Sequence, residues 1–272
     1  MTNTEIHKEI NSRIFLQAQH LSPMLNFGQT KEYSIITQTL DVTLKLQAMV
    51  YHIENYKILD KQYLNDAVEN FHEFPNTINN CCSLIYELEA FLFQLKSALD
   101  MAIKVTGKLL PNHFKSQTFG NKGEHFIKNL EIYKKVRIDR SELIESIIEM
   151  VKDDQKKWLR ESVELRDTIS HYKSIGFFAY KITRENEQII VQKPKILNKD
   201  PQSFMESTFR NCMEFIQDLI SFSIILFLPK PFVLSKPNVP DSWHNDGVGK
   251  FIKYSLGIDT SKTTIKELNS ES

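Results

Sequence analysis

The chain has 272 residues, of which 41% are hydrophobic, and it carries 34 basic and 34 acidic residues. This length and hydrophobic content are sufficient for a packed core and exclude a disordered protein. Because the net charge is zero, no overall field attracts the protein to nucleic acid, and such binding requires a local basic patch. The three cysteines, Cys81, Cys82 and Cys212, predict no disulfide framework and favour a reducing cytoplasm.

The N-terminal segment lacks the basic region and the apolar run of a signal peptide, so we expect no export. The most hydrophobic stretch, 219–229, is about half of the roughly 20 residues that a membrane span requires. Glu214 and Asp218 also precede it. We therefore expect a cytoplasmic protein with no membrane association.

Residues 1–75 are predicted to be a helical extension that packs on the rest of the protein. Apolar residues recur at mainly helical spacing over 30–58, and a second helical piece is expected over about 60–72. Pro75 then interrupts the pattern. This part contains no residues that suggest chemistry, so we assign it a packing or interaction role.

The clearest helical pattern lies next along the chain. Its apolar positions alternate steps of three and four, which predicts a helix whose seam is buried against other helices. These positions are Ile85, Leu88, Leu92, Leu95, Leu99, Ala102, Thr106 and Leu109. Glu89, Phe93, Lys96 and Asp100 follow the margin of the same seam. Lys96 and Asp100 also have the i, i+4 spacing of an ordinary surface ion pair.

The segment 104–140 is locally basic, with nine Lys or Arg residues, three Asp or Glu residues and several aromatic residues between them. Such a mixture suits phosphate contact and base stacking, and Lys134, Lys135 and Arg137 are our RNA-binding candidates in it. A solvated helix face is the alternative interpretation. The run Asp139-Arg140-Ser141-Glu142 resembles a capping box and predicts the start of a short helix.

A second helix is expected from about Asp154, and its apolar stripe contains an arginine. Arg166 lies in the middle of that stripe, which is formed by Trp158, Leu159, Ser162, Val163, Leu165 and Ile169. A buried unpaired guanidinium costs several kcal/mol. Arg166 therefore requires a carboxylate partner, a polar cleft or a subunit interface, and His171 follows it where the helical pattern ends.

After His171 the pattern alternates, which predicts a β-hairpin between Gly176 and Ile196. Lys173 and Lys181 make this hairpin a second basic element and are further RNA-binding candidates. Asp200-Pro201 is an N-cap signal for a last long helix that should stop at Pro229. The apolar face of that helix is broad enough to suggest burial on two sides, against the scaffold and a second subunit. We expect residues 231–272 to form a tail that is only partly ordered.

The run Arg166-Asp167-Thr168-Ile169-Ser170-His171 resembles the Arg-x(4–6)-His motif of HEPN domains. The resemblance covers residues 77–229 and implies an all-α HEPN-like bundle over 76–230, with the hairpin inserted before the last long helix. It implies a metal-independent endoribonuclease of toxin or defence type, without a cofactor, that uses the RNA 2′-hydroxyl as nucleophile. Arg166 would hold the phosphate, and His171 would transfer protons.

The resemblance also implies a homodimer whose two motifs face each other, and it leaves an antitoxin or other partner protein open. Glu89 or Asp100 would be the counter-ion of Arg166, and Asp167 would orient the histidine or bind the partner chain. In a straight helix Arg166 and His171 point about 140° apart, so dimerisation or a distorted last turn must bring them together. The alternative is a non-catalytic HEPN-like module that binds nucleotide or protein. No sequence motif for a metal site is present.

Overall fold

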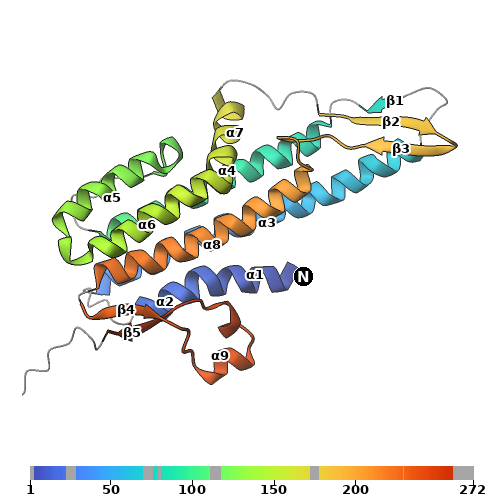
Figure 1. The fold of residues 1–272 in the computed structure, drawn as a ribbon. Helices are drawn as coiled ribbons and strands as arrows, with labels where there is room; N and C mark the ends of the chain where they lie inside the picture. Colours follow the sequence, from blue (N-terminus) through green and yellow to red (C-terminus); the bar gives the residue numbers. More distant parts are fainter. Residues whose placement is uncertain are drawn as a thin grey trace, which may run out of the picture.

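The computed structural model describes residues 3–22, 29–69, 76–78, 81–110, 118–171, 178–228 and 230–259. For residues 3, 29–34, 76–78, 121, 171 and 244 this description covers the backbone alone. Most of the described residues are helical, which confirms the predicted all-α character. Figure 1 shows long helices lying side by side in one elongated bundle, with a small sheet at each end.

The first helical run lies along the bundle and contributes to its core. It consists of α1 (Asn3–Asn11), the π-helical turn η1 (Ser12–Leu16) and α2 (Gln17–Leu21). Steps of three and four residues place one apolar face of this run against α3 and α8. The buried residues of this face are Ile10, Ile14, Ala18 and Leu21.

Helix α3 (Gln29–Glu69) is a single helix of 41 residues, whereas we expected a break near residue 60. The reason is that no proline or glycine occurs between residues 29 and 69. Asp60, at the expected break, is buried and is satisfied by Tyr180 and Lys193, which both donate hydrogen bonds to its carboxylate. The carboxylate therefore anchors the hairpin to α3 instead of ending the helix.

Helix α4 (Cys82–Leu109) confirms the predicted buried seam. All of the predicted seam positions from Leu88 to Leu109 are buried, and Ile85 is partly buried. The helix packs against α3, α7 and α8, so it occupies the middle of the bundle. Cys81 and Cys212 are buried, Cys82 is exposed, and none of these three described residues forms a disulfide.

The middle of the chain forms a helical hairpin followed by a bent helix. Helix α5 (Glu124–Val136) follows the turn η3 (Asn121–Gly123) and packs on α6 (Ser141–Asp154). The predicted capping box is wrong, because no side chain caps α6 and Asp139 instead pairs with Arg137. Residues 138–140 form the short turn η4 that leads into α6.

The expected start of a separate helix at Asp154 is also wrong. The backbone continues from α6 through the π-helical turn η5 (Gln155–Leu159) into α7 (Arg160–His171) without a break. Figure 1 shows α7 leaving the direction of α6 and rising out of the bundle. The π turn is therefore the point at which the motif-bearing part of the chain departs from the other long helices.

Helix α8 (Pro201–Phe227) begins and ends where the sequence predicts. The Asp200 side chain accepts a hydrogen bond from the Ser203 amide at 2.9 Å, and Pro201 occupies the first helical position. Its broad apolar face is covered within the chain, because α8 packs against α2, α3, α4 and α6. The width of this face is thus explained without a second subunit.

The predicted hairpin is confirmed as β2 (Tyr180–Glu185) and β3 (Gln188–Gln192), which are antiparallel. A third strand that we did not predict, β1 (Asn76–Ile78), pairs with β2 and completes the sheet. Tyr180 is buried at the base of this sheet, where it stacks on Tyr63 and hydrogen-bonds to Asp60.

The C-terminal segment contains ordered elements up to residue 259. Strands β4 (Phe232–Ser235) and β5 (Ser255–Ile258) are antiparallel, and α9 (Asp241–Asn245) and the turn η6 (Gly249–Phe251) lie between them. Gln17 in α2 accepts hydrogen bonds from the amides of Lys253 and Tyr254. These bonds attach the segment to the N-terminal helical run.

One hydrophobic cluster contains buried residues from every long helix of the bundle. Residues of α1, η1 and α3, which lie within 1–75, share this cluster with residues of α4, α6 and α8, which lie within 76–230. The predicted boundary near residue 75 therefore divides segments that bury their apolar faces in a common core.

Candidate functional site

Helix α7 places Arg166 at the margin of α4. The Arg166 side chain is 23% exposed, and its guanidinium carbon lies 5.1 Å from the centroid of the Phe93 ring. Its Nη1 donates a hydrogen bond of 2.9 Å to Oδ1 of Asp167. The stripe around it is buried at Trp158, Leu159, Ser162 and Val163 and partly buried at Leu165 and Ile169. Arg166 therefore lies where the buried stripe meets the surface.

The expected counter-ions of Arg166 are wrong. Asp100 pairs with Lys96 at 2.5 Å and accepts a hydrogen bond from the Phe119 amide at 2.6 Å. Among the described residues, Glu89 forms no ion pair. The carboxylate that neutralises Arg166 is Asp167, its neighbour in sequence. A local partner was available, so the guanidinium did not require a carboxylate from another helix.

The hydrogen-bonding capacity of Arg166 is largely unused. A guanidinium has five N–H donors, and the described residues accept one hydrogen bond from it, through Asp167. Its Nε is buried without a hydrogen-bond partner among the described residues. A buried donor that is not satisfied costs about 1–3 kcal/mol. Nε of Arg140 is buried without a partner in the same way, so this atom alone does not mark a ligand site; the unused amino groups of Arg166 are the donors that a phosphate or carboxylate could engage.

His171 is the last residue of α7, and its side chain lies outside the described part of the structure. The backbone remains helical from Arg160 to His171, so the last turn is not unwound at Ser170. In a regular helix positions 166 and 171 lie about 140° apart around the axis. The backbone of a single α7 therefore does not place these two positions on one face of the helix.

The RNA-binding candidates from the sequence are distributed over the molecule. Lys173 lies outside the described residues, and Lys181 is exposed on β2. Lys134 pairs with Glu145 at 2.5 Å, Arg137 pairs with Asp139 at 2.9 Å, and Lys135 is exposed.

The three candidates on or next to α5 are remote from the motif. Their end of α5 leads through η4 to the start of α6, whereas α7 begins after the end of α6. The 19 residues from Ser141 to Leu159 correspond to roughly 28 Å of helix. Lys134, Lys135 and Arg137 are therefore not brought next to Arg166.

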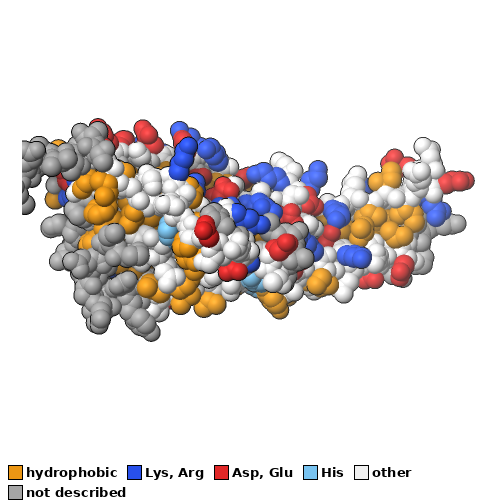
Figure 2. All heavy atoms as spheres, turned by 90° about the horizontal axis from the view of Figure 1, so that it is seen from below, with side chains coloured by type: hydrophobic (Ala, Val, Ile, Leu, Met, Phe, Trp, Pro, Cys, Tyr) orange, Lys and Arg blue, Asp and Glu red, His pale blue; other side chains and the backbone are white. Residues whose placement is uncertain are grey.

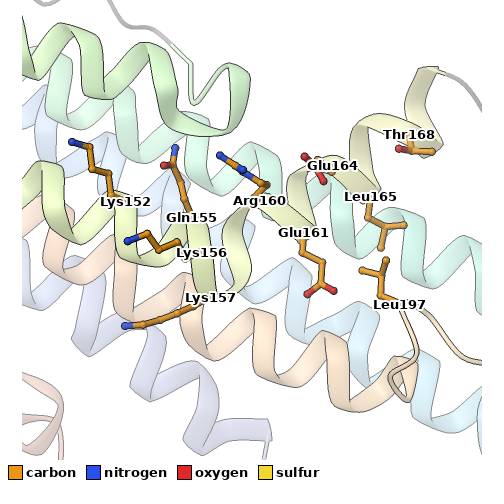
Figure 3. Close-up of a pocket in the computed structure, with 10 residues that line it drawn as sticks. All are labelled: Lys152, Gln155, Lys156, Lys157, Arg160, Glu161, Glu164, Leu165, Thr168 and Leu197. Carbon is orange, nitrogen blue, oxygen red and sulfur yellow. The ribbon is translucent and has the colours of Figure 1, made fainter.

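A groove beside α7 contains basic residues that the sequence analysis did not select. Its volume is about 930 Å³, and it is lined by Lys152, Gln155, Lys156, Lys157, Arg160, Glu161, Glu164, Leu165, Thr168 and Leu197. Figure 3 shows that these residues come mainly from α6, η5 and α7, with Leu197 facing them from the loop before α8. The sequence signal for this groove is four cations within the nine residues 152–160. Asp153 and Asp154 lie among them and lower the local net charge, so this stretch was not selected as basic.

The turn η3, before α5, contacts two of the residues that line the groove. Gln155 donates a hydrogen bond of 2.7 Å to the Lys122 carbonyl, and the Lys122 ammonium pairs with Glu164 on α7. These contacts hold η5 and the start of α7 in place. Burial raises the pKa of Asp154, whose carboxylate accepts a 2.8 Å hydrogen bond from the Trp158 indole nitrogen.

The visible surface is mixed in charge. Figure 2 shows Lys and Arg side chains interspersed with Asp and Glu in the middle of one face, and hydrophobic side chains toward the end that carries β1–β3. This agrees with the net charge of zero. Within the described ranges, no group of three or more His, Cys, Asp or Glu residues is arranged to hold a metal ion.

Comparison with protein-family models, with curated proteins and with solved structures finds no match to this chain. Among the helices of the described segments, none is both long and apolar enough to cross a membrane. The assignment of a function therefore depends on the geometry around Arg166.

Proposed function

We propose that this protein is a HEPN-type, metal-independent endoribonuclease of toxin or defence type, active in the cytoplasm as a homodimer with a composite Arg166 and His171 site. The observation that carries this proposal is the state of Arg166. Its guanidinium is partly buried beside Phe93, has only Asp167 as a hydrogen-bond partner among the described residues, and lies on the helix that ends at His171. A planar, permanently charged fork in this position suits a phosphate oxygen pair.

The chemistry requires no metal, because RNA carries its own nucleophile. His171 of one protomer takes the proton of the 2′-hydroxyl, and the 2′-oxygen attacks the adjacent phosphorus. Arg166 stabilises the additional negative charge on the phosphate oxygens. The bond from phosphorus to the 5′-oxygen then breaks, and the second protomer's histidine protonates that oxygen. The products are a 2′,3′-cyclic phosphate and a free 5′-hydroxyl.

A homodimer is supported by an exposed apolar row on α3. Leu44, Tyr51 and Ile58 recur every seven residues, and their side chains are 60%, 62% and 57% exposed. Residues seven apart lie on one face of a helix, as in coiled-coil contacts. An exposed row of this kind is typical of a protein interface, and a second copy of the same row would cover it. Leu40, 41% exposed, extends it by one turn.

The alternative function is a non-catalytic module that binds nucleotide or protein. The observation that favours it is the ion pair between Arg166 and Asp167, because a neutralised guanidinium attracts phosphate less strongly. In that case Arg166 would stabilise the contact between α7 and α4 through Phe93.

The two functions are separated by RNA cleavage in the presence of EDTA. We expect wild-type protein to cut single-stranded RNA and leave 2′,3′-cyclic phosphate ends. Loss of the proton-transferring group in His171→Ala should slow cleavage by about 10²–10⁴. Equal rates for the two proteins would remove the catalytic assignment, and cleavage abolished by EDTA would require a metal site instead.

The dimer is tested by sedimentation velocity at micromolar concentration. Leu44→Lys with Ile58→Lys should convert the protein to monomer without unfolding it, since both side chains are largely exposed in the single chain. The monomer should also lose cleavage. A wild-type protein that is strictly monomeric, or a monomeric variant with full activity, would contradict the composite site.

A further inference from the structure

The groove beside α7 has a cationic wall. Lys152, Lys156, Lys157 and Arg160 are exposed and line it together. In the view of Figure 3 Lys152 and Arg160 extend upward, Lys156 extends to the left and Lys157 lies lowest of the four, whereas Glu161 points downward, away from Arg160. The π turn η5 lies between Lys152 and Arg160, and such turns are frequent at functional sites. The shape of this stretch of helix thus gathers four cations along one groove.

The charges in the groove are not balanced by its own carboxylates. Glu161 pairs with Lys199 at 2.7 Å, and Glu164 pairs with Lys122. Both carboxylates are therefore neutralised by residues that belong to other segments. Within the described ranges, the wall forms an ion pair through Lys156 and Asp153, at 3.8 Å and with both side chains largely exposed. Such a pair contributes little.

Three cations of the wall lack an ion pair within the described part of the chain. These are Lys152, Lys157 and Arg160. Lys152 and Lys157 interact electrostatically with Glu145 and Asp154 without forming ion pairs with them. Exposed cations that are not held in ion pairs retain condensed counter-ions that a polyanion can displace. The chemistry of the wall therefore fits a chain of phosphates.

The other end of the groove is apolar and adjoins the motif. Leu165 and Leu197 line it, and Leu197 is 43% exposed. Leu165 and Thr168 lie on either side of Arg166 in sequence, so the groove reaches the motif helix. An apolar surface can contact the faces of unpaired bases, which a duplex hides in its stack. The combination of a cationic wall and an apolar end favours a single strand over a duplex.

We propose that the groove between Lys152 and Thr168 binds the phosphate backbone of single-stranded RNA and leads it to Arg166. That the strand is led to Arg166 rests on the proposed ribonuclease function. The binding of the strand in the groove does not depend on cleavage. From Lys152 to Thr168 the helix rises by roughly 24 Å, which is enough for several nucleotides.

The test is the binding of a fluorescent single-stranded RNA with 2′-O-methyl groups, which cannot be cut by its own 2′-oxygen. Fluorescence anisotropy is measured over a range of monovalent salt concentrations. Each phosphate contact contributes a slope of about 0.7 in log K against log salt for a single strand. Lys157→Gln with Arg160→Gln should reduce the slope by about 1.4 and weaken binding about 20-fold at roughly 0.1 M salt.

The matched control is Lys61→Gln with Lys236→Gln, which removes the same charge from exposed positions outside the groove. The control should bind like wild type. If both double variants weaken binding equally, or if wild-type protein binds duplex RNA of the same sequence as tightly, the groove proposal is overturned. Wild-type protein that does not bind the RNA at all also overturns it.

Failure of the proposed ribonuclease function would give a different pattern of binding and cleavage from failure of the groove proposal. If the groove variant loses binding while unmodified RNA is cut equally by wild type and His171→Ala, the groove stands and the catalytic assignment falls. If His171→Ala loses cleavage while the groove variant keeps full binding, the catalytic assignment stands and the groove proposal falls.

Discussion

Two arginines of this protein differ in what their guanidinium groups contact. Arg140 is 7% exposed and donates hydrogen bonds to the Leu228 and Phe232 carbonyls, at 2.7 and 3.3 Å. It therefore joins the start of α6 to the end of α8 and the start of β4. Burial lowers the pKa of its guanidinium. Arg166 is more exposed and has Asp167 and Phe93 as its contacts.

The difference lies in what each guanidinium satisfies. Arg140 bonds the carbonyl of Leu228 at the C-terminal end of α8, where helices leave carbonyls without intrahelical partners. Within the described residues, Arg166 donates a hydrogen bond to Asp167, its neighbour in sequence, and it contacts α4 through the Phe93 ring. A cation that completes the backbone of another element is needed for folding. A cation whose hydrogen bond is to its neighbour in sequence keeps donors for a ligand.

The largest expected effect is on catalysis at Arg166. Arg166→Ala should slow RNA cleavage by about 10²–10³, because it removes the group that stabilises charge on the phosphate. The free energy of unfolding of the Arg166→Ala variant should differ from that of wild type by no more than about 1 kcal/mol, since the pair with Asp167 is partly exposed. Single-turnover cleavage and urea unfolding measure the two quantities. A loss of stability comparable to that of an Arg140 variant would make Arg166 structural as well.

Arg140→Met should give the opposite result. It leaves the Leu228 and Phe232 carbonyls without their donor, which should lower the free energy of unfolding by about 3 kcal/mol. The cleavage rate per folded molecule should remain unchanged. Arg137→Met is the matched control, because Arg137 forms a surface pair with Asp139 that is worth less than about 1 kcal/mol. Equal losses in urea unfolding for the two variants would contradict this role of Arg140.

Asp167→Asn tests whether Asp167 only positions the Arg166 guanidinium or also takes part in proton transfer. The asparagine keeps an oxygen that can accept the Arg166 hydrogen bond but removes the charge, so stability should change by roughly 0.5 kcal/mol. Cleavage should change by less than about tenfold if Asp167 only orients the guanidinium. A decrease near that of His171→Ala would instead show that Asp167 takes part in proton transfer. Cleavage kinetics of the folded variant decide between them.

The smallest expected effect concerns Asp154, a partly buried carboxyl between the two arginines in sequence. Burial raises its pKa, so its contribution to stability is fully present below the unfolded-state value and is lost as pH rises through the folded-state value. Asp154→Asn does not titrate and can still accept the Trp158 hydrogen bond. The variant should therefore gain stability relative to wild type between acidic and neutral pH, by less than about 1 kcal/mol.

Urea unfolding at several pH values measures this difference. The surface variant Asp153→Asn is the comparison, because Asp153 is 61% exposed and raises the pKa of Asp154 less than burial does; it should alter the pH dependence of stability less than Asp154→Asn. A stability difference for Asp154→Asn that is independent of pH would contradict the effect of burial.

Much of the fold could be predicted because the signals were local. The seam of α4 and the start and end of α8 depend on apolar spacing and on Asp200-Pro201 and Pro229, which act within a few residues. The hairpin β2–β3 is encoded by alternation and a short turn. The break expected in α3 was wrong because no proline or glycine interrupts residues 29–69 and because the buried Asp60 is satisfied by Tyr180, 120 positions away. The capping box was wrong because Arg137 holds Asp139.

The candidate site shows the same limit. The sequence by itself determined that an arginine interrupts the apolar stripe of a helix ending at His171, because helical periodicity is a local property. Only the tertiary structure decided that Asp167 and Phe93 are its contacts, that Lys134 and Arg137 lie elsewhere, and that a groove beside α7 is cationic. The groove is cationic because Glu161 and Glu164 are paired with the distant Lys199 and Lys122, and those pairings are set by the packing of segments in three dimensions.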